Sequence, residues 1–480
     1  MNVARTVGWN VLVQLGSRAA QLLFSGISTL ILVRSLGPST YGEYALVIAI
    51  VSLCGLIAEA GIGRIATRDM SRNPAEEASL LSQAVLLRLL LGLLATTVAM
   101  LSGILLHLPL IVLAGIALGS LTFYLDALAS VGLIFQVRLK MQYDAIAMVC
   151  SKAAVLLTVL LAALLHASVL IFFCALLVGS GMMAIVAWFF ATKLTTILWT
   201  YNRQRSSQLL RQSIPSGIAL LVAVVYLKVD GVLLGVFKGA TALGIYSAAY
   251  RPIEYFLLAG SVIVNPIYPL LSKNFATNHR EFLHIYQQSF IAVIIPLGAI
   301  MLLNLAYAPQ LLSFVFGASY QDAAGPYRIL TIVLPLLFCN GWQALALLTA
   351  DRQTITMLID SGGLIINLSA NLLLIPRFGS VGCASAALLT AIFVSSAGNV
   401  AAHRHAGATL PLSAILRTAF AVGICATPLS VINHHLWPLT GAVALLLYLS
   451  LLLAFRVLQV NQLRNLLPAR LTATAKGLLS

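Results

Sequence analysis

The sequence is poor in charged residues. Only 9% of its 480 residues are Asp, Glu, Lys or Arg, whereas 60% are hydrophobic. A soluble globular chain averages about 25% charged and about 45–50% apolar residues. No polar stretch is long enough to build a soluble domain. These shortages exclude a soluble enzyme or a soluble nucleic-acid-binding domain, and they predict a polytopic, all-α membrane protein.

The motifs that mark common catalytic and cofactor sites are also missing. The chain has no GxxxxGK[ST] loop for nucleotide phosphates and no Gly-x-Ser-x-Gly elbow. Its 6 cysteines lie singly in apolar runs, and its 8 histidines fall at span ends or in loops, without metal-ligand spacing. We therefore expect no ATP use by this chain, no metal site and no cofactor.

Long apolar runs fill most of the chain. A membrane-spanning helix needs about 20 mostly apolar residues, and fourteen runs reach this length. The first run is too long for a cleaved signal peptide and carries Arg18 in its middle, so we expect it to be a span. The runs cover residues 8–33, 44–63, 79–106, 110–135, 145–165, 168–192, 213–237, 244–271, 288–308, 329–350, 354–375, 381–402, 412–433 and 438–457.

The basic residues give the orientation of these spans. The formal net charge is +15, from 28 Lys and Arg against 13 Asp and Glu. With the N-terminus in the cytoplasm, eighteen basic residues fall on the cytoplasmic side, four on the opposite side and six inside spans. Loops rich in Lys and Arg stay in the cytoplasm. The positive charge therefore predicts a multi-pass protein with both termini cytoplasmic, and not a protein that binds nucleic acid.

The chain contains an internal repeat. Residues Tyr41–Tyr44 (YGEY) align with Leu243–Tyr246 (LGIY), 202 residues later, and each motif follows an apolar run and a short Gly-containing turn. A polar, basic stretch separates the sixth and seventh runs. We predict two six-helix lobes as parallel repeats, with a site near the midplane between them. The expected parts are an N-lobe at 1–192, a cytoplasmic linker at 193–212, a C-lobe at 213–402, and two C-terminal helices with a cytoplasmic tail at 403–480.

Four cations lie well inside predicted spans. Arg18 is about 16 Å into the first span at 1.5 Å per residue, Lys228 is also deep, and Arg88 and Arg251 lie about one third of the way in. A charge inside a span costs about 2.5–3.5 kcal/mol on insertion scales. We therefore expect these four side chains to face the bundle interior or an aqueous cavity. Lys152 lies nearer an end, where snorkelling is an equal alternative.

Acidic residues also occur inside the spans. Arg251 and Glu254 are three residues apart on one helix and can pair, which leaves a purely structural ion pair open. Lys228 and Asp230 are two residues apart and point to different faces, so each needs another partner or water. Together with Asp126, the acids Asp230 and Glu254 are candidates for ion coupling.

Five segments resemble a known family. The segments LVRSLGPSTYGEYAL and EAGIGRIATRDMSR resemble the first two spans of the polysaccharide transporter family. These are the flippases of lipid-linked oligosaccharides, within the multidrug/oligosaccharidyl-lipid/polysaccharide superfamily. The run VDGVLLGVFKGATALGIYSAAYRPIE looks like the seventh and eighth spans of that family. FGASYQDAAGPYRIL and NLLLIPRFGSVGCASAAL are similar to its later loops. The resemblance covers roughly the first 400 residues.

The resemblance implies a function as well as a fold. It implies two lobes around a central cavity that opens to either side in turn, in a bacterial inner membrane. The implied substrate is an oligosaccharide on undecaprenyl diphosphate, moved from the cytoplasmic to the periplasmic leaflet for O-antigen, capsule or exopolysaccharide synthesis. Carried over, the basic cavity of the family comprises Arg18, Lys228, Arg251 and, less directly, Arg88, and Asp230 matches a recurrent acid. Implied partners are membrane lipids, with a polysaccharide polymerase and a chain-length regulator as candidates.

Two alternative functions stay open. A multidrug or cation antiporter of the same superfamily would use acids rather than cations in its cavity. A membrane glycan polymerase or ligase would need a large extracytoplasmic loop with catalytic residues. The longest such loop that we predict, at 309–327, has Asp322 as its only charged residue. The composition of the spans therefore favours transport of an anionic substrate.

Overall fold

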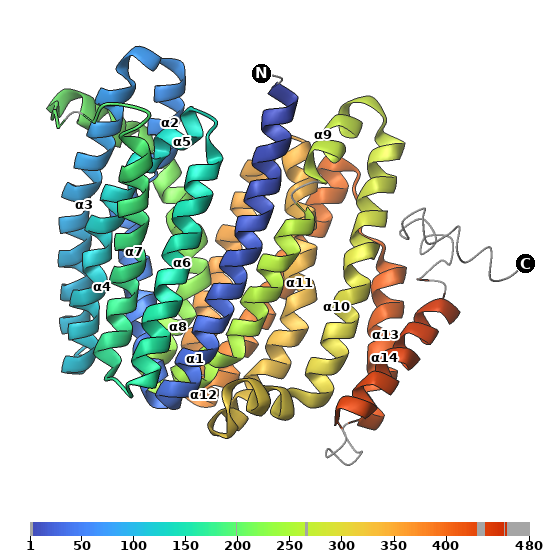
Figure 1. The fold of residues 1–480 in the computed structure, drawn as a ribbon. Helices are drawn as coiled ribbons and strands as arrows, with labels where there is room; N and C mark the ends of the chain where they lie inside the picture. The colour runs from blue at the N-terminus through green and yellow to red at the C-terminus, as the bar shows by residue number, and fades with distance from the viewer. Residues whose placement is uncertain (1–2, 198, 265–266, 430–436, 456, 458–480) are drawn as a thin grey trace, which may run out of the picture. The chain divides into compact units, whose positions relative to one another are not determined.

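The computed structural model describes residues 3–197, 199–264, 267–429, 437–455 and 457. These residues form α-helices and short 3-10 turns, and they contain no strand (Figure 1). The α-helices are α1 (Val3–Glu59), α2 (Ile62–Arg72), α3 (Glu77–Leu105), α4 (Leu110–Ala129), α5 (Leu133–Val137), α6 (Met141–Leu164), α7 (Val169–Ala191), α8 (Arg203–Val264), α9 (Tyr268–Thr277), α10 (His279–Phe316), α11 (Ala324–Thr349), α12 (Gln353–Ala406), α13 (Leu412–Leu429) and α14 (Trp437–Ala454).

The apolar runs of the sequence lie on these helices. In the described part of the chain, 11 helices are long and apolar enough to cross a membrane. Three helices, α1, α8 and α12, each carry two of the predicted runs. Between the two runs of each helix lies a glycine with positive φ, at Gly37, Gly239 or Gly379, where the backbone is not helical. The prediction of an all-α polytopic membrane protein is confirmed. Residues 430–433 of the thirteenth run and the tail at 458–480 lie outside the described residues.

The two turns of the internal repeat contact each other. A Cβ on Gly42 would overlap the carbonyl oxygen of Ala240, and a Cβ on Gly244 would overlap the carbonyl oxygen of Pro38. Gly42 and Gly244 are 202 residues apart, and so are Pro38 and Ala240, which is the offset of the repeat in the sequence. The contact is therefore reciprocal, with each turn seated against the matching glycine of the other. Glycine is needed at both positions because the two backbones approach too closely for a side chain.

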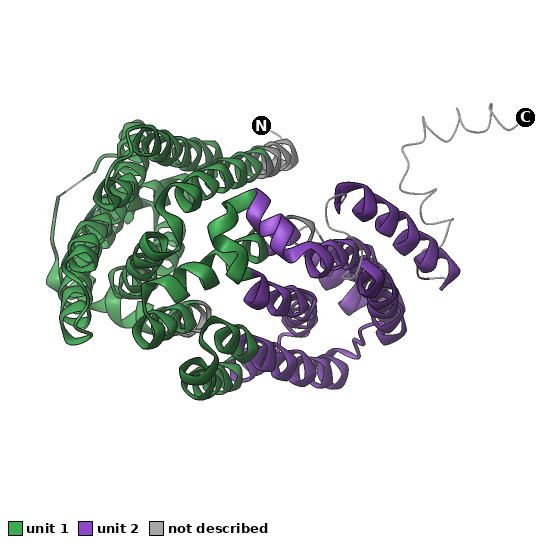
Figure 2. Cartoon of the chain, turned by 90° about the horizontal axis from the view of Figure 1, so that it is seen from below, with its two compact units in different colours: residues 1–255, 315–323, 360–386 green, residues 256–314, 324–359, 387–480 purple. Residues whose placement is uncertain are grey.

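The chain divides into two compact units. Unit 1 comprises residues 1–255, 315–323 and 360–386, and unit 2 comprises residues 256–314, 324–359 and 387–480 (Figure 2). These units group the chain by packing, whereas the predicted lobes at 1–192 and 213–402 follow the sequence repeat. The two lobes therefore stay a prediction.

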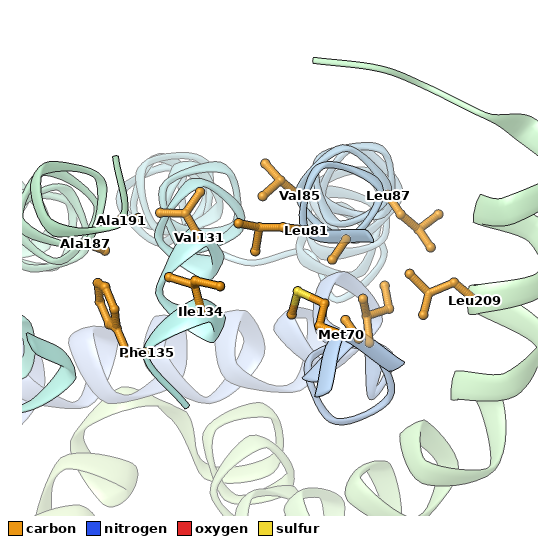
Figure 3. Packing of buried hydrophobic residues seen from close by; sticks show 13 residues of the cluster. Met70, Leu81, Val85, Leu87, Val131, Ile134, Phe135, Ala187, Ala191 and Leu209 are labelled. Carbon is orange, nitrogen blue, oxygen red and sulfur yellow. The ribbon is translucent and has the colours of Figure 1, made fainter. Parts of the chain in front are cut away.

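Helices α3, α4, α6 and α7 of unit 1 pack beside α1 (Figure 1). At the end of unit 1 where α2 and α5 lie, a cluster of buried apolar residues joins α2, α3, α5, α7 and α8 (Figure 3). Met70, Leu81, Ile134 and Phe135 are fully buried in this cluster, and Leu209 of α8 is 4% exposed. Burial of these side chains holds the N-terminal end of α8 against the first helices.

The predicted linker at 193–212 is fastened to α3. Helix α8 begins within it, so only its N-terminal part is irregular. The buried amide of Gln83 donates to the carbonyl oxygen of Thr200 at 2.5 Å, and it accepts from the backbone N–H of Asn202 at 3.1 Å and from the hydroxyl of Ser206 at 2.6 Å. One buried side chain thus satisfies three polar groups of the linker, which a freely mobile connection would leave to water.

The segment 309–327, predicted as the longest extracytoplasmic loop, is mostly helical. The expectation of a loop over these residues is therefore wrong. Helix α10 continues to Phe316, a 3-10 helix covers Ala318–Ala323, and α11 begins at Ala324. The turn residues in this stretch end one helix and begin the next. The Tyr320 hydroxyl donates to the carbonyl oxygen of Val33 at 3.0 Å, which fixes the 3-10 helix to α1.

Unit 2 has its own core. Helices α10, α13 and α14 share a cluster of buried apolar residues that includes Leu302, Ala421 and Tyr448. The buried Tyr448 hydroxyl donates to the carbonyl oxygen of Ile295 at 2.8 Å. The two last helices are therefore packed onto α10 and are part of this unit.

Gly42→Ala tests the contact between the two turns. We expect the added Cβ to push the turns apart and to destabilise the protein by about 1–3 kcal/mol, the usual cost of overpacking. The measurement is the thermal unfolding of the purified protein in detergent. Gly26→Ala is the matched control, since a Cβ at this position of α1 meets nothing within 4 Å. An equal effect of both substitutions would contradict the close approach.

Candidate functional site

A cluster of three charged side chains lies within the two arms of α8. The Nζ of Lys228 lies 3.1 Å from the Oε1 of Glu254, and the Nη1 of Arg251 lies 2.7 Å from its Oε2. One carboxylate is thus shared by two cations. The side chains of Lys228, Glu254 and Arg251 are 31%, 25% and 25% exposed, so the cluster is partly open. We call these three residues the charged triad.

The turn at Gly239 explains why these residues meet. Its φ of 81° and ψ of 176° are far from helical values, so the chain reverses between the two arms of α8. In such a hairpin, residues at roughly equal sequence distances from the turn come side by side. Lys228 precedes Gly239 by about as many residues as Arg251 follows it. The i, i+3 spacing then brings Glu254 to the same side as Arg251.

Asp230 is held separately from the triad. Its carboxylate accepts a hydrogen bond from the Tyr246 hydroxyl at 2.9 Å and from the backbone N–H of Gly231 at 2.8 Å. Asp230 is 9% exposed, and no cation of the described residues lies within ion-pair distance of it. Lys228 and Asp230 therefore have different partners, as their spacing predicts.

The triad is also tied to α1. The Nε of Arg251 donates to the Tyr41 hydroxyl at 3.1 Å. Side chains of α1 and α8 enclose a small cavity of about 60 Å³ beside the triad. Its lining residues are Ala45, Ile48, Ala49, Lys228, Asp230, Gly231, Leu243, Tyr246, Ser247, Tyr250, Arg251 and Glu254.

The triad carries a net positive charge. Its two cations and one carboxylate sum to one formal positive charge within a membrane-spanning helix pair, and the Asp230 carboxylate, which Tyr246 holds, lines the same cavity. Lys and Arg in such a setting bind phosphate strongly, because charge-assisted hydrogen bonds gain strength where water is scarce. The arrangement can therefore hold an anion, at the cost of weakening the contacts of Glu254.

The other predicted site residues lie elsewhere. Arg88 pairs with Glu59 at 3.5 Å and lines a second cavity together with Asp126. Arg18 is exposed on α1, and it makes no ion pair or hydrogen bond with the residues that the structure describes. Of the seven residues that the sequence proposes, the structure gathers Lys228, Arg251, Glu254 and Asp230 at one cavity. It gathers Arg88 and Asp126 at another, and places Arg18 at neither.

Two tyrosines of the site are absent from the sequence-based set. Tyr41 and Tyr246 contact Arg251 and Asp230, respectively. Both belong to the repeated motif around Gly42 and Gly244. Pairing the two arms of α8 across the Gly239 turn would have placed Tyr246 near Asp230, whereas Tyr41 needs the packing of α1 against α8.

The described residues contain no group of three or more His, Cys, Asp and Glu side chains that could hold a metal ion. All six cysteines are free thiols.

The fold is that of a polytopic, all-α membrane protein. Solved structures of low sequence identity share this fold. Lipid II flippase MurJ in an inward closed conformation superposes with a TM-score of 0.76 at 13% identity, over 93% of this chain and 99% of that one. Multidrug resistance MATE family transporters of the MOP superfamily have TM-scores of 0.61 (inward-facing, 15% identity, 82% and 98% coverage) and 0.54 (outward-facing, 13% identity, 83% and 96% coverage).

The chain belongs to the polysaccharide biosynthesis protein family, whose sequence profile matches residues 3–275. This match covers the first of the two repeats, α8 with its charged triad, and most of α9. No curated protein matches the chain. The family resemblance drawn from the five sequence segments is confirmed.

Tyr246→Phe tests how the Asp230 carboxylate is held. Removal of the hydroxyl leaves a buried acceptor short of a donor, which costs about 1–3 kcal/mol. We expect a lower Tm in detergent for Tyr246→Phe, and a smaller additional loss when Asp230→Asn is already present, because the two residues are coupled. Tyr201→Phe is the control, since Tyr201 is 55% exposed. Strictly additive losses would contradict the coupling.

Proposed function

We propose that the protein is a flippase that moves an oligosaccharide on a polyprenyl diphosphate from the cytoplasmic to the periplasmic leaflet. The move would proceed by alternating access and supply a surface polysaccharide. One observation carries this proposal: the net positive charged triad of Lys228, Arg251 and Glu254 in a membrane-embedded cavity. Membership of the polysaccharide biosynthesis protein family and a fold shared with a lipid flippase support it.

The diphosphate would exchange places with Glu254. Its oxygens compete for the same donors, the ammonium of Lys228 and the guanidinium of Arg251, and guanidinium can bind phosphate through two parallel hydrogen bonds. At an effective dielectric constant of about 20, two unit charges 4 Å apart attract by about 4 kcal/mol before desolvation is subtracted. A diphosphate carries more charge than one carboxylate, so it displaces Glu254 from at least one of its cations.

The displaced carboxylate gives a way to reset the site. An uncompensated carboxylate in a membrane interior is unfavourable and takes up a proton if one is available. When Glu254 loses this proton, it again competes for Lys228 and Arg251 and expels the diphosphate. Asp230 is buried against Tyr246 and pairs with no cation of the described residues, so it is a second group that can bind a proton or a cation in this cycle.

Arg18 would bind the headgroup before it reaches the triad. Its side chain is exposed on α1. The sugar then follows the diphosphate through a polar path while the polyprenyl chain stays in lipid.

A cation antiporter is the second candidate function. The observation that favours it is Asp230, a buried carboxylate without an ion-pair partner among the described residues. An antiporter would use Asp230 for its substrate and the triad for structure. Efflux of cationic drugs from a deficient strain, restored by the wild-type gene and not by Asp230→Asn, would favour this candidate.

Lys228→Met tests the role of the triad in transport. Loss of one cation leaves Arg251 paired with Glu254 and removes the net positive charge, so we expect loss of surface glycan in a strain that lacks its own copy. Binding of polyprenyl diphosphate to the purified protein should weaken at least tenfold, which is about 1.4 kcal/mol. Lys238→Met, an exposed lysine on the same helix, is the control. Normal export by a well-expressed Lys228→Met protein would refute this role.

Glu254→Gln tests whether the Glu254 carboxylate competes with the diphosphate or positions Lys228 and Arg251 to bind it. If the carboxylate competes with the diphosphate, the amide should bind polyprenyl diphosphate about tenfold more tightly while export falls, because release is slowed. Isothermal titration in detergent gives the affinity, and surface glycan gives the export. Weaker binding by Glu254→Gln would show instead that Glu254 positions the two cations.

A further inference from the structure

Unit 1 contains a second, larger cavity. It has a volume of about 440 Å³ and lies between α1, α3, α4, α6 and α7. This volume falls within the range of small-molecule sites, about 300–1,000 Å³. Ile48 of α1 lines both this cavity and the one beside the charged triad, so the two cavities adjoin at that side chain. We call the larger one the N-terminal cavity.

Four charged side chains line the N-terminal cavity: Glu59, Arg88, Asp126 and Lys152. Two are cations and two are acids, so their formal charges cancel. Arg88 and Glu59 are paired loosely, with 3.5 Å between Nη2 and Oε2. Charges inside membrane spans are costly and mark functional cavities by default. Four of them around one cavity are more than a structural ion pair requires.

These charges keep unused hydrogen-bonding capacity. The Nε of Arg88 is buried and has no hydrogen-bond partner in the described part of the protein. Lys152 and Asp126 both have exposed side chains, and neither forms an ion pair with a described residue. The Ser180 hydroxyl is the side-chain hydrogen-bond partner of Asp126. Lys152 and Asp126 thus line one cavity without an ion pair between them, and both side chains are open to a ligand.

We propose that the N-terminal cavity binds a neutral hexose unit of the transported glycan. Each sugar hydroxyl both donates and accepts hydrogen bonds. Neighbouring hydroxyls can therefore donate to the carboxylates of Asp126 and Glu59 while accepting from Lys152 and Arg88. The aromatic ring of Phe123 lines the same cavity and offers an apolar wall for the C–H face of a sugar ring. The proposal rests on the flippase function, because it is the carrier lipid that brings the sugar.

The balance of charge argues for a neutral sugar. A uronic acid would add a third acid to two acids and two cations, and an amino sugar would add a third cation. Either leaves one charge without a partner in a poorly hydrated site, which is unfavourable. A neutral hexose leaves the four charges balanced and fills the open donors and acceptors.

The test compares two lipids on the purified full-length protein: polyprenyl diphosphate without sugar and the same lipid with one neutral hexose. We expect the hexose to tighten binding about tenfold in the wild type. Asp126→Asn and Lys152→Met should each abolish this gain and leave the affinity for the sugar-free lipid unchanged. Ser180→Ala, a smaller change beside Asp126, should reduce the gain. Lys273→Met is the control, because it removes an exposed lysine outside both cavities.

Three results would overturn the proposal. They are no gain from the hexose in the wild type, a gain only with a uronic acid or an amino sugar in place of the hexose, and an equal loss for both lipids in the variants. Lys228→Met should weaken both lipids, so failure of the flippase function is seen separately. A second measurement needs no lipid: high concentrations of free methyl hexosides should raise the Tm of the wild type but not that of Asp126→Asn.

Discussion

Glu254 and its two cations set the conditions for the rest of the site. The Glu254 carboxylate stabilises both an ammonium and a guanidinium within one membrane-embedded hairpin, and its removal would leave two uncompensated cations, whereas removal of either cation would leave a neutral pair. The triad also links the two arms of α8, and through Tyr41 it links α8 to α1. The same three groups that hold the hairpin together carry one net positive charge. Structural support and anion binding therefore depend on one shared carboxylate.

The site breaks the symmetry of the repeat on which it is built. The turns at Gly37 and Gly239 match in position and conformation, and Gly42 and Gly244 contact each other reciprocally. The charged triad has no such counterpart. At the offset of 202 residues, the positions that correspond to its members are occupied by Gly26, Ala49 and Ser52. The repeat thus supplies the close packing of two hairpins, and only the second hairpin carries the charged triad.

The two cavities of unit 1 differ in size and in the pairing of their charges. The smaller has its cations engaged by one acid and its second acid engaged by a tyrosine. The larger is lined by four charged side chains, of which Arg88 and Glu59 pair loosely and Lys152 and Asp126 form no ion pair with a described residue. A ligand with an anionic part and a neutral, hydroxylated part matches this division. The adjoining walls at Ile48 would let one molecule contact both cavities.

The sequence by itself determined the membrane class, the apolar runs, the family and the repeat, because apolar composition and spacing are local properties of the chain. It also predicted that Arg251 can pair with Glu254 and that Lys228 and Asp230 point to different faces, since helical spacing fixes the faces of one helix. Only the tertiary structure decided that Lys228 shares Glu254, that Tyr246 holds Asp230, and that Arg88 and Asp126 belong to a separate cavity. These contacts join residues across a turn or between helices, where the packing of backbones, and not sequence spacing, sets which side chains meet.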